Sequence, residues 1–219
     1  AVSGSSATWV LSNHDVVRHA TRYGNQTHDL APTDDPVTLL SRGVPTTQDR
    51  ALGARRARAA TMLILALPGS TYLYQGEELG LFEVAEITPE QRQDPTYFRT
   101  NGERPGRDGC RVPLPWTADE PSYGFGSADP HLPQPDWFAD YTVAVESDDP
   151  DSSLSLYWAA LKLRRELQGV ESLEWREGGP QVVHFARSNG WHSLTNFGST
   201  SVSLPDGEIL LTSGPLDHG

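Results

Sequence analysis

The order of three segments constrains the fold most: a short apolar run, an Ala-rich helix and a second short apolar run. Residues 7–11 are apolar, β-branched or aromatic without strict alternation, which is typical of a strand covered on both faces in a parallel sheet. Residues 53–67 carry apolar side chains at helical spacing and stop at Pro68 and Gly69, and residues 70–74 form another strand-like run. This order predicts a parallel α/β architecture.

The rest of the chain divides into three parts. Residues 76–150 are rich in proline and acidic residues and have little periodicity, which predicts a long loop, and their many aromatic side chains indicate that it is ordered. A helix over residues 154–167 follows, with capping side chains before it. Strands are then expected at 182–186, 191–197 and 208–211, separated by turns. We expect one unit at 1–169 and a small antiparallel β-domain at 170–219.

Charge and cysteine content exclude several classes of partner and site. Seventeen basic against 29 acidic residues give a net charge of −12, which argues against nucleic acid and anionic membranes. The single cysteine, Cys110, cannot form an intrachain disulfide, and a reducing, cytoplasmic location fits it. No apolar run is long enough to span a bilayer.

The polar triplet Asn13-His14-Asp15 follows the first predicted strand directly. In barrels and doubly wound sheets, catalytic side chains gather at the carboxyl ends of parallel strands. Asn and Asp are also common in turns, so the triplet could simply cap the next segment. Position alone is consistent with both a catalytic role and a capping role for the triplet.

Three motifs carry a resemblance to a known family. Residues 9–15 (WVLSNHD), with Arg18 and residues 21–24 (TRYG), look like the seventh barrel strand of the α-amylase superfamily, glycoside hydrolase family 13. Residues 67–80 (LPGSTYLYQGEELG) resemble its eighth strand segment, and residues 107–116 (RDGCRVPLPW) are similar to the following loop in its α-glucosidase and oligo-1,6-glucosidase branch. The nearest resemblance is to actinobacterial enzymes of that branch.

The resemblance implies a fold and a set of site residues. It implies the C-terminal part of a (β/α)8 TIM barrel, strands 7 and 8 with their helices, before the small antiparallel domain. Asp15 would be the catalytic carboxylate that stabilises the transition state, in line with the strengthening of hydrogen bonds to the sugar 2-hydroxyl. His14 and Asn13 would bind the same sugar, and Arg111 would contact the terminal glucose of an oligosaccharide. No cofactor and no metal are implied, because glycosyl transfer through carboxylates needs neither.

The resemblance also implies that some of the active site is missing. A retaining glycosidase needs a nucleophile and an acid/base carboxylate, which in this family follow earlier barrel strands. Glu77 and Glu78 cannot fill both roles, since adjacent residues on an extended segment point to opposite faces. We therefore expect a fragment that is inactive alone and needs the N-terminal portion of the same enzyme as its partner.

Other functions remain open at this point. The same site residues would suit trehalose synthase or another isomerase or transglycosylase of the family. A protein of another class, a non-catalytic carbohydrate-binding module or partner subunit, is a further alternative. Retention of Asp15, His14 and Arg111 together counts against the non-catalytic alternative.

Overall fold

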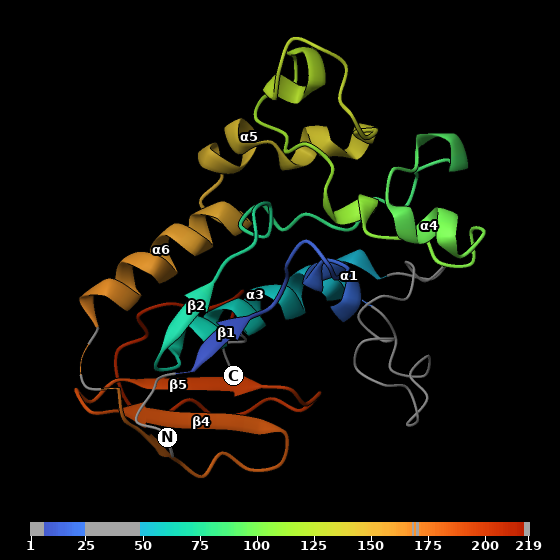
Figure 1. Cartoon of the computed structure of the whole chain (residues 1–219). Helices are drawn as coiled ribbons and strands as arrows, with labels where there is room; N and C mark the ends of the chain where they lie inside the picture. Colours follow the sequence, from blue (N-terminus) through green and yellow to red (C-terminus); the bar gives the residue numbers. More distant parts are fainter. Residues whose placement is uncertain (1–6, 25–48, 168, 170, 217–219) are drawn as a thin grey trace.

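The first part of the structure contains a parallel strand pair. In this computed structural model, which describes residues 7–24, 49–167, 169 and 171–216, the chain runs through β1 (Thr8–Val10), α1 (His19–Tyr23), α3 (Arg50–Ala66) and β2 (Ser70–Tyr72). β1 and β2 pair in parallel, with Trp9 opposite Thr71, as the sequence predicts. Figure 1 shows the pair beside α3, with the long segment that follows β2 leading away toward the top of the view.

The two strands are less covered than the sequence suggests. In each, the two outer residues are exposed and the middle one is half-buried, and Tyr72 is 68% exposed. The prediction of a first strand covered on both faces is therefore wrong for the described part of the chain. Each strand has only one hydrogen-bonded neighbour there, which leaves an open edge and an uncovered face on the pair.

Helix α3 begins three residues earlier than predicted, because the Asp49 side chain accepts a hydrogen bond of 2.9 Å from the backbone N–H of Leu52. Helix α1 packs closely against it: a Cβ at Gly53 would lie 2.3 Å from the carbonyl oxygen of Ala20. On another side, α3 packs against α6 (Ser153–Glu166).

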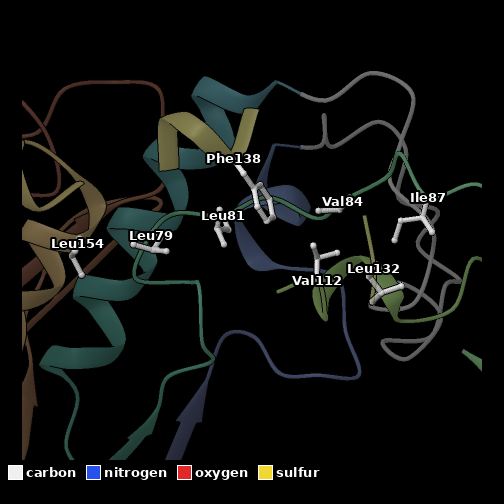
Figure 2. Close-up of a cluster of buried hydrophobic side chains, with 8 residues drawn as sticks. All are labelled: Leu79, Leu81, Val84, Ile87, Val112, Leu132, Phe138 and Leu154. Atoms are coloured by element: carbon white, nitrogen blue, oxygen red, sulfur yellow. The ribbon is translucent and has the colours of Figure 1, made fainter. Parts of the chain in front are cut away.

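Residues 76–150 are ordered and partly helical. They contain α4, α5 and four short 3-10 helices, at Pro95–Arg99, Val143–Asp148, Pro89–Gln91, Asp108–Cys110, Pro121–Gly124 and Asp136–Tyr141. The segment has its own buried core with the first turn of α6, drawn in Figure 2: Leu79, Leu81, Val84, Ile87, Val112, Leu132, Phe138 and Leu154. The predicted loop is thus a packed layer beyond the carboxyl ends of β1 and β2 (Figure 1).

The C-terminal part contains an antiparallel sheet of three strands in the order β3-β4-β5, at Leu173–Trp175, Val182–Arg187 and His192–Asn196. Two of these strands agree with the sequence prediction, and β3 is additional. The predicted strand at residues 208–211 is wrong: this segment pairs with no strand in the described structure.

Arginine side chains from this sheet and from α6 bind the C-terminal end of α3. The guanidinium group of Arg187 donates to the carbonyl of Ala66 at 2.8 Å, and that of Arg164 on α6 donates to the carbonyls of Leu65, Leu67 and Gly69. Both arginines therefore satisfy carbonyls at and just beyond the C-terminal end of α3.

Candidate active site

The polar triplet leaves the carboxyl end of β1 through a tight, buried junction. The Oγ of Ser12 accepts a hydrogen bond of 2.9 Å from the backbone N–H of His19 and lies 2.8 Å from the Nδ1 of the same residue. Both side chains are buried, at 2% exposure each. These bonds fix the start and end of the loop that carries residues 13–15.

Buried Arg18 joins this loop to two other segments. Its guanidinium group donates to the carbonyls of Gln75, which follows β2, and Cys110, at 2.9 and 3.0 Å. Its backbone N–H donates to the carboxylate of Glu83 at 2.9 Å, and its guanidinium carbon lies 5.2 Å from the centre of the Tyr74 ring. Arg18 therefore holds the ends of both strands and the segment around residue 110 together.

All four predicted site residues meet at this point. The Oδ1 of Asp15 accepts a hydrogen bond of 3.3 Å from Arg111, whose Nε donates to the carbonyl of His14 at 2.9 Å. The imidazole Nε2 of His14 lies 3.4 Å from the other carboxylate oxygen of Asp15. Asn13 has a local role: its side-chain oxygen accepts the backbone N–H of Asp15 at 2.8 Å and closes an Asx turn.

A second arginine, to which the sequence assigned no role, also binds Asp15. Arg107 donates from Nη1 to Asp15 Oδ1 at 2.8 Å and, on its other edge, from Nε to the Oδ2 of Asp94 at 2.5 Å. The Asp94 side chain is fully buried, whereas that of Asp15 is 51% exposed. Arg107 thus connects an open carboxylate at the site to a carboxylate in the interior.

The sequence gives little signal for this connection. Asp94 caps α4 by accepting the backbone N–H of Thr96 at 2.8 Å, and a capping role alone would explain an Asp before a Pro. Nothing in the spacing of Asp94 and Arg107 distinguishes a paired carboxylate from a simple cap. The pair is visible only in three dimensions.

The two arginines keep Asp15 ionised. The hydrogen bond from Arg107, together with the charges of His14, Arg107 and Arg111, lowers the pKa of the Asp15 carboxyl and outweighs the opposing effect of desolvation. Burial would raise the pKa of Asp94, but the hydrogen bonds from Arg107 and Thr96 outweigh it and hold that pKa well below its usual value. The site therefore presents a solvent-accessible anion flanked by guanidinium groups, which suits hydroxyl-bearing neutral ligands.

Glu77 and Glu78 lie apart from this surface. They occupy a turn rather than the extended segment assumed from the sequence. Glu77 is buried, accepts a hydrogen bond of 3.2 Å from the hydroxyl of Tyr157, and has a pKa raised by burial to about 7. Glu78 accepts the backbone N–H of Gly76 at 2.8 Å. Neither carboxylate is placed to act on a ligand bound at Asp15.

The described residues offer neither a metal cluster nor a membrane-spanning helix. They contain no group of three or more histidine, cysteine or acidic side chains arranged to hold a metal ion. None of the helices in the same part of the chain has the length and apolar character required to cross a membrane.

Known proteins match most of the chain. Residues 2–172 match the family model described as "Alpha amylase, catalytic domain". A "Probable alpha-glucosidase" of Rhizobium meliloti (strain 1021) is 34% identical over 188 residues, which cover 84% of this chain and 29% of that protein. An "Oligo-1,6-glucosidase" of Parageobacillus thermoglucosidasius is 26% identical over 231 residues, covering 92% of this chain and 36% of that protein.

A solved structure agrees with the sequence matches. The crystal structure of XgtA, titled an "alpha-glucosyl transfer enzyme", is 34% identical, superposes with a TM-score of 0.68 and covers 93% of this chain and 34% of its own. The chain thus spans only about a third of the length of the proteins it matches. With the family model covering most of its residues, the chain belongs to the α-amylase family, glycoside hydrolase family 13.

Proposed function

We propose that this chain forms part of the active site of a retaining α-glucosidase that removes terminal α-linked glucose from malto- or isomalto-oligosaccharides. One observation carries the proposal: Asp15, His14 and Arg111 converge at the carboxyl end of a parallel strand in a chain of this family. Asp15 stabilises the oxocarbenium-like transition state by accepting hydrogen bonds from sugar hydroxyls. His14 and Arg111 bind the same glucose unit, and Asn13 fixes the turn that aims Asp15.

The nucleophile and the acid/base come from other barrel strands of the complete enzyme. Retaining hydrolysis needs two carboxylates about 5–5.5 Å apart across the scissile bond. The interior carboxylates next to the site are unsuitable, because both are buried away from a ligand: Asp94 is fully buried against Arg107, and Glu77 is buried and accepts a hydrogen bond from Tyr157. The exposed side chains of Val10 and Tyr72 support the presence of further strands, since a closed barrel covers both.

In this proposal β1 and β2 are barrel strands 7 and 8, and residues 76–150 are the loop after strand 8. The antiparallel sheet of β3, β4 and β5 belongs to a C-terminal β-domain at residues 170–219, and the barrel part spans residues 1–169. The parallel register of β1 and β2 and the packed layer at their carboxyl ends support this division.

The test uses a chimaera in which this chain replaces the matching segment of the Rhizobium meliloti protein. We expect hydrolysis of maltose, and a fall in kcat of about 10²- to 10³-fold for Asp15→Asn, because one transition-state hydrogen-bond partner is lost. Asp140→Asn, at an exposed carboxylate in the loop, is the matched control and should leave kcat unchanged. The proposal is wrong if Asp15→Asn retains full activity, or if the purified 219-residue chain hydrolyses maltose with no other polypeptide present.

Glucosyl transfer is a second candidate, favoured by the 34% identity to an enzyme titled for that activity. Transfer and hydrolysis share a covalent glycosyl-enzyme and differ in whether a sugar or water attacks it. Chromatography of the chimaera's products on maltose separates the outcomes: glucose alone indicates hydrolysis, and new disaccharides or trisaccharides indicate isomerisation or transfer. Oligosaccharide binding that survives both Asp15→Ala and Arg111→Ala would instead favour a non-catalytic module.

A further inference from the structure

A pair of histidines lies on the antiparallel sheet, away from the residues assigned to the active site. His184 on β4 and His192 on β5 are diagonal neighbours, because Ala186 is the direct partner of His192 in the register. Their ring centres are 5.1 Å apart, and His184 Nε2 lies 2.9 Å from His192 Nδ1. Alternation along the strands puts them on the face opposite the buried side chain of Phe185.

The hydrogen bonds assign the protons on the two rings. The carbonyl of Glu177 can only accept, so the Nδ1–H of His184 donates to it, over a long 3.4 Å. The Nε2 of His184 then carries a lone pair and accepts from His192 Nδ1–H. A backbone carbonyl behind one ring nitrogen is the usual partner of a metal-binding histidine, since it fixes the tautomer and orients the free nitrogen.

The separation of the two nitrogens suits a particular coordination geometry. With metal–nitrogen bonds of about 2.0–2.1 Å, nitrogens 2.9 Å apart subtend about 90° at the metal. That is the angle between neighbouring ligands in square-planar, tetragonal or octahedral complexes of Cu²⁺ and Ni²⁺. Tetrahedral Zn²⁺ would need about 3.3 Å between the same atoms. We propose that His184 and His192 form a surface site for Cu²⁺ or Ni²⁺.

Binding requires one proton rearrangement and a turn of both rings, because in the hydrogen bond the two facing nitrogens point at each other rather than at a common ion. His192 gives up its Nδ1 proton to solvent and takes one at Nε2, so that both facing nitrogens offer a lone pair to the ion. The remaining coordination positions are filled by water, which reaches the pair because His192 is exposed and lines an open groove of about 360 Å³. Glu174 lies on the same face, and its carboxylate is held by Arg176 at 2.8 Å.

The test is calorimetric titration of the full 219-residue chain with NiCl₂ or CuCl₂ alone, in a buffer without chelating groups. We expect saturable binding of one equivalent, about tenfold to hundredfold weaker in His184→Asn and in His192→Asn. His131→Asn is the matched control, because this histidine is exposed and lies in the loop far along the chain from the pair. It should bind as the unmodified chain does.

A second measurement does not depend on the variants. Cu²⁺ is paramagnetic in each of these geometries, so substoichiometric addition of CuCl₂ should broaden the imidazole proton resonances of His184 and His192 before those of the other histidines. The absence of saturable binding, binding unchanged in either single variant, or broadening that begins at another histidine would each overturn the proposal. None of these outcomes bears on the proposed glucosidase activity, which depends on Asp15.

Discussion

Removal of the Arg107 side chain should destabilise the protein through Asp94. The Asp94 carboxylate is fully buried and receives two hydrogen bonds from this guanidinium group, of 2.5 and 3.3 Å. Removing one partner of a buried ion pair costs about 3–5 kcal/mol. The Arg107 side chain is 37% exposed, and backbone N–H groups still bind Asp94 in the variant, so we expect about 2–3 kcal/mol for Arg107→Ala.

The effect should depend on pH in a defined direction. The pKa of Asp94 is lowered in the folded protein, so its pairing stabilises the fold above the ordinary pKa of 3.8 and stops doing so as the carboxyl becomes protonated. The difference in unfolding free energy between the unmodified chain and Arg107→Ala should therefore be largest near neutral pH. It should shrink as the pH falls below 3.8.

Urea unfolding followed by circular dichroism measures this difference at each pH. A double-mutant cycle with Asp94→Asn should give a coupling energy of about 1–2 kcal/mol, since the two side chains are in direct contact. Arg104→Ala, at an exposed arginine of the same loop, is the control and should cost less than about 0.5 kcal/mol. A cost for Arg107→Ala equal to that of the control, or a zero coupling energy, would refute the reasoning.

Two further predictions concern the interior. Gly53→Ala should lower the free energy of unfolding by more than about 1 kcal/mol, because the new methyl group would lie 2.3 Å from the Ala20 carbonyl oxygen and α1 would have to move. Ala54→Ser, one residue further along α3, is the milder comparison in the same urea assay. Equal losses of unfolding free energy in the two variants would contradict the close approach of α1 to Gly53. Glu77→Gln should gain stability relative to the unmodified chain as the pH rises from 4.5 to about 7, because burial raises the folded pKa of Glu77 and ionisation then opposes folding. A difference in unfolding free energy that is constant over that window would contradict the assignment.

Local chemistry made much of the fold predictable. α3 and α6 follow from helical spacing and capping residues, and the parallel order of β1 and β2 follows from a helix-containing connection. β3 is not predicted because three residues are too short to show alternation, and residues 208–211 have a strand-like pattern but pair with no strand in the described part of the chain. A strand forms only when another segment pairs with it, and the local sequence pattern does not show which segment that is.

Only those residues of the candidate site that lie within the family motifs could be proposed from the sequence. Asp15, His14 and Arg111 lie together in the structure, although Arg111 follows Asp15 and His14 by 96 and 97 residues. Arg107 and Asp94 were not assigned, because their contact depends on how a long proline-rich loop folds back on itself. The sequence places Arg18 in a motif, and its role in joining three backbone segments is seen only in the structure.

The arginines at the end of α3 have a consequence for folding during synthesis. The carbonyls of Ala66 and Leu67 receive their side-chain donors from residues 121 and 97 positions later in the chain. When α3 leaves the ribosome, those donors have not yet been made, and water must occupy these carbonyls until Arg164 and Arg187 emerge. Contacts this distant in sequence slow the search for the native state. The C-terminal end of α3 should thus reach its final contacts only after Arg187 has been synthesised.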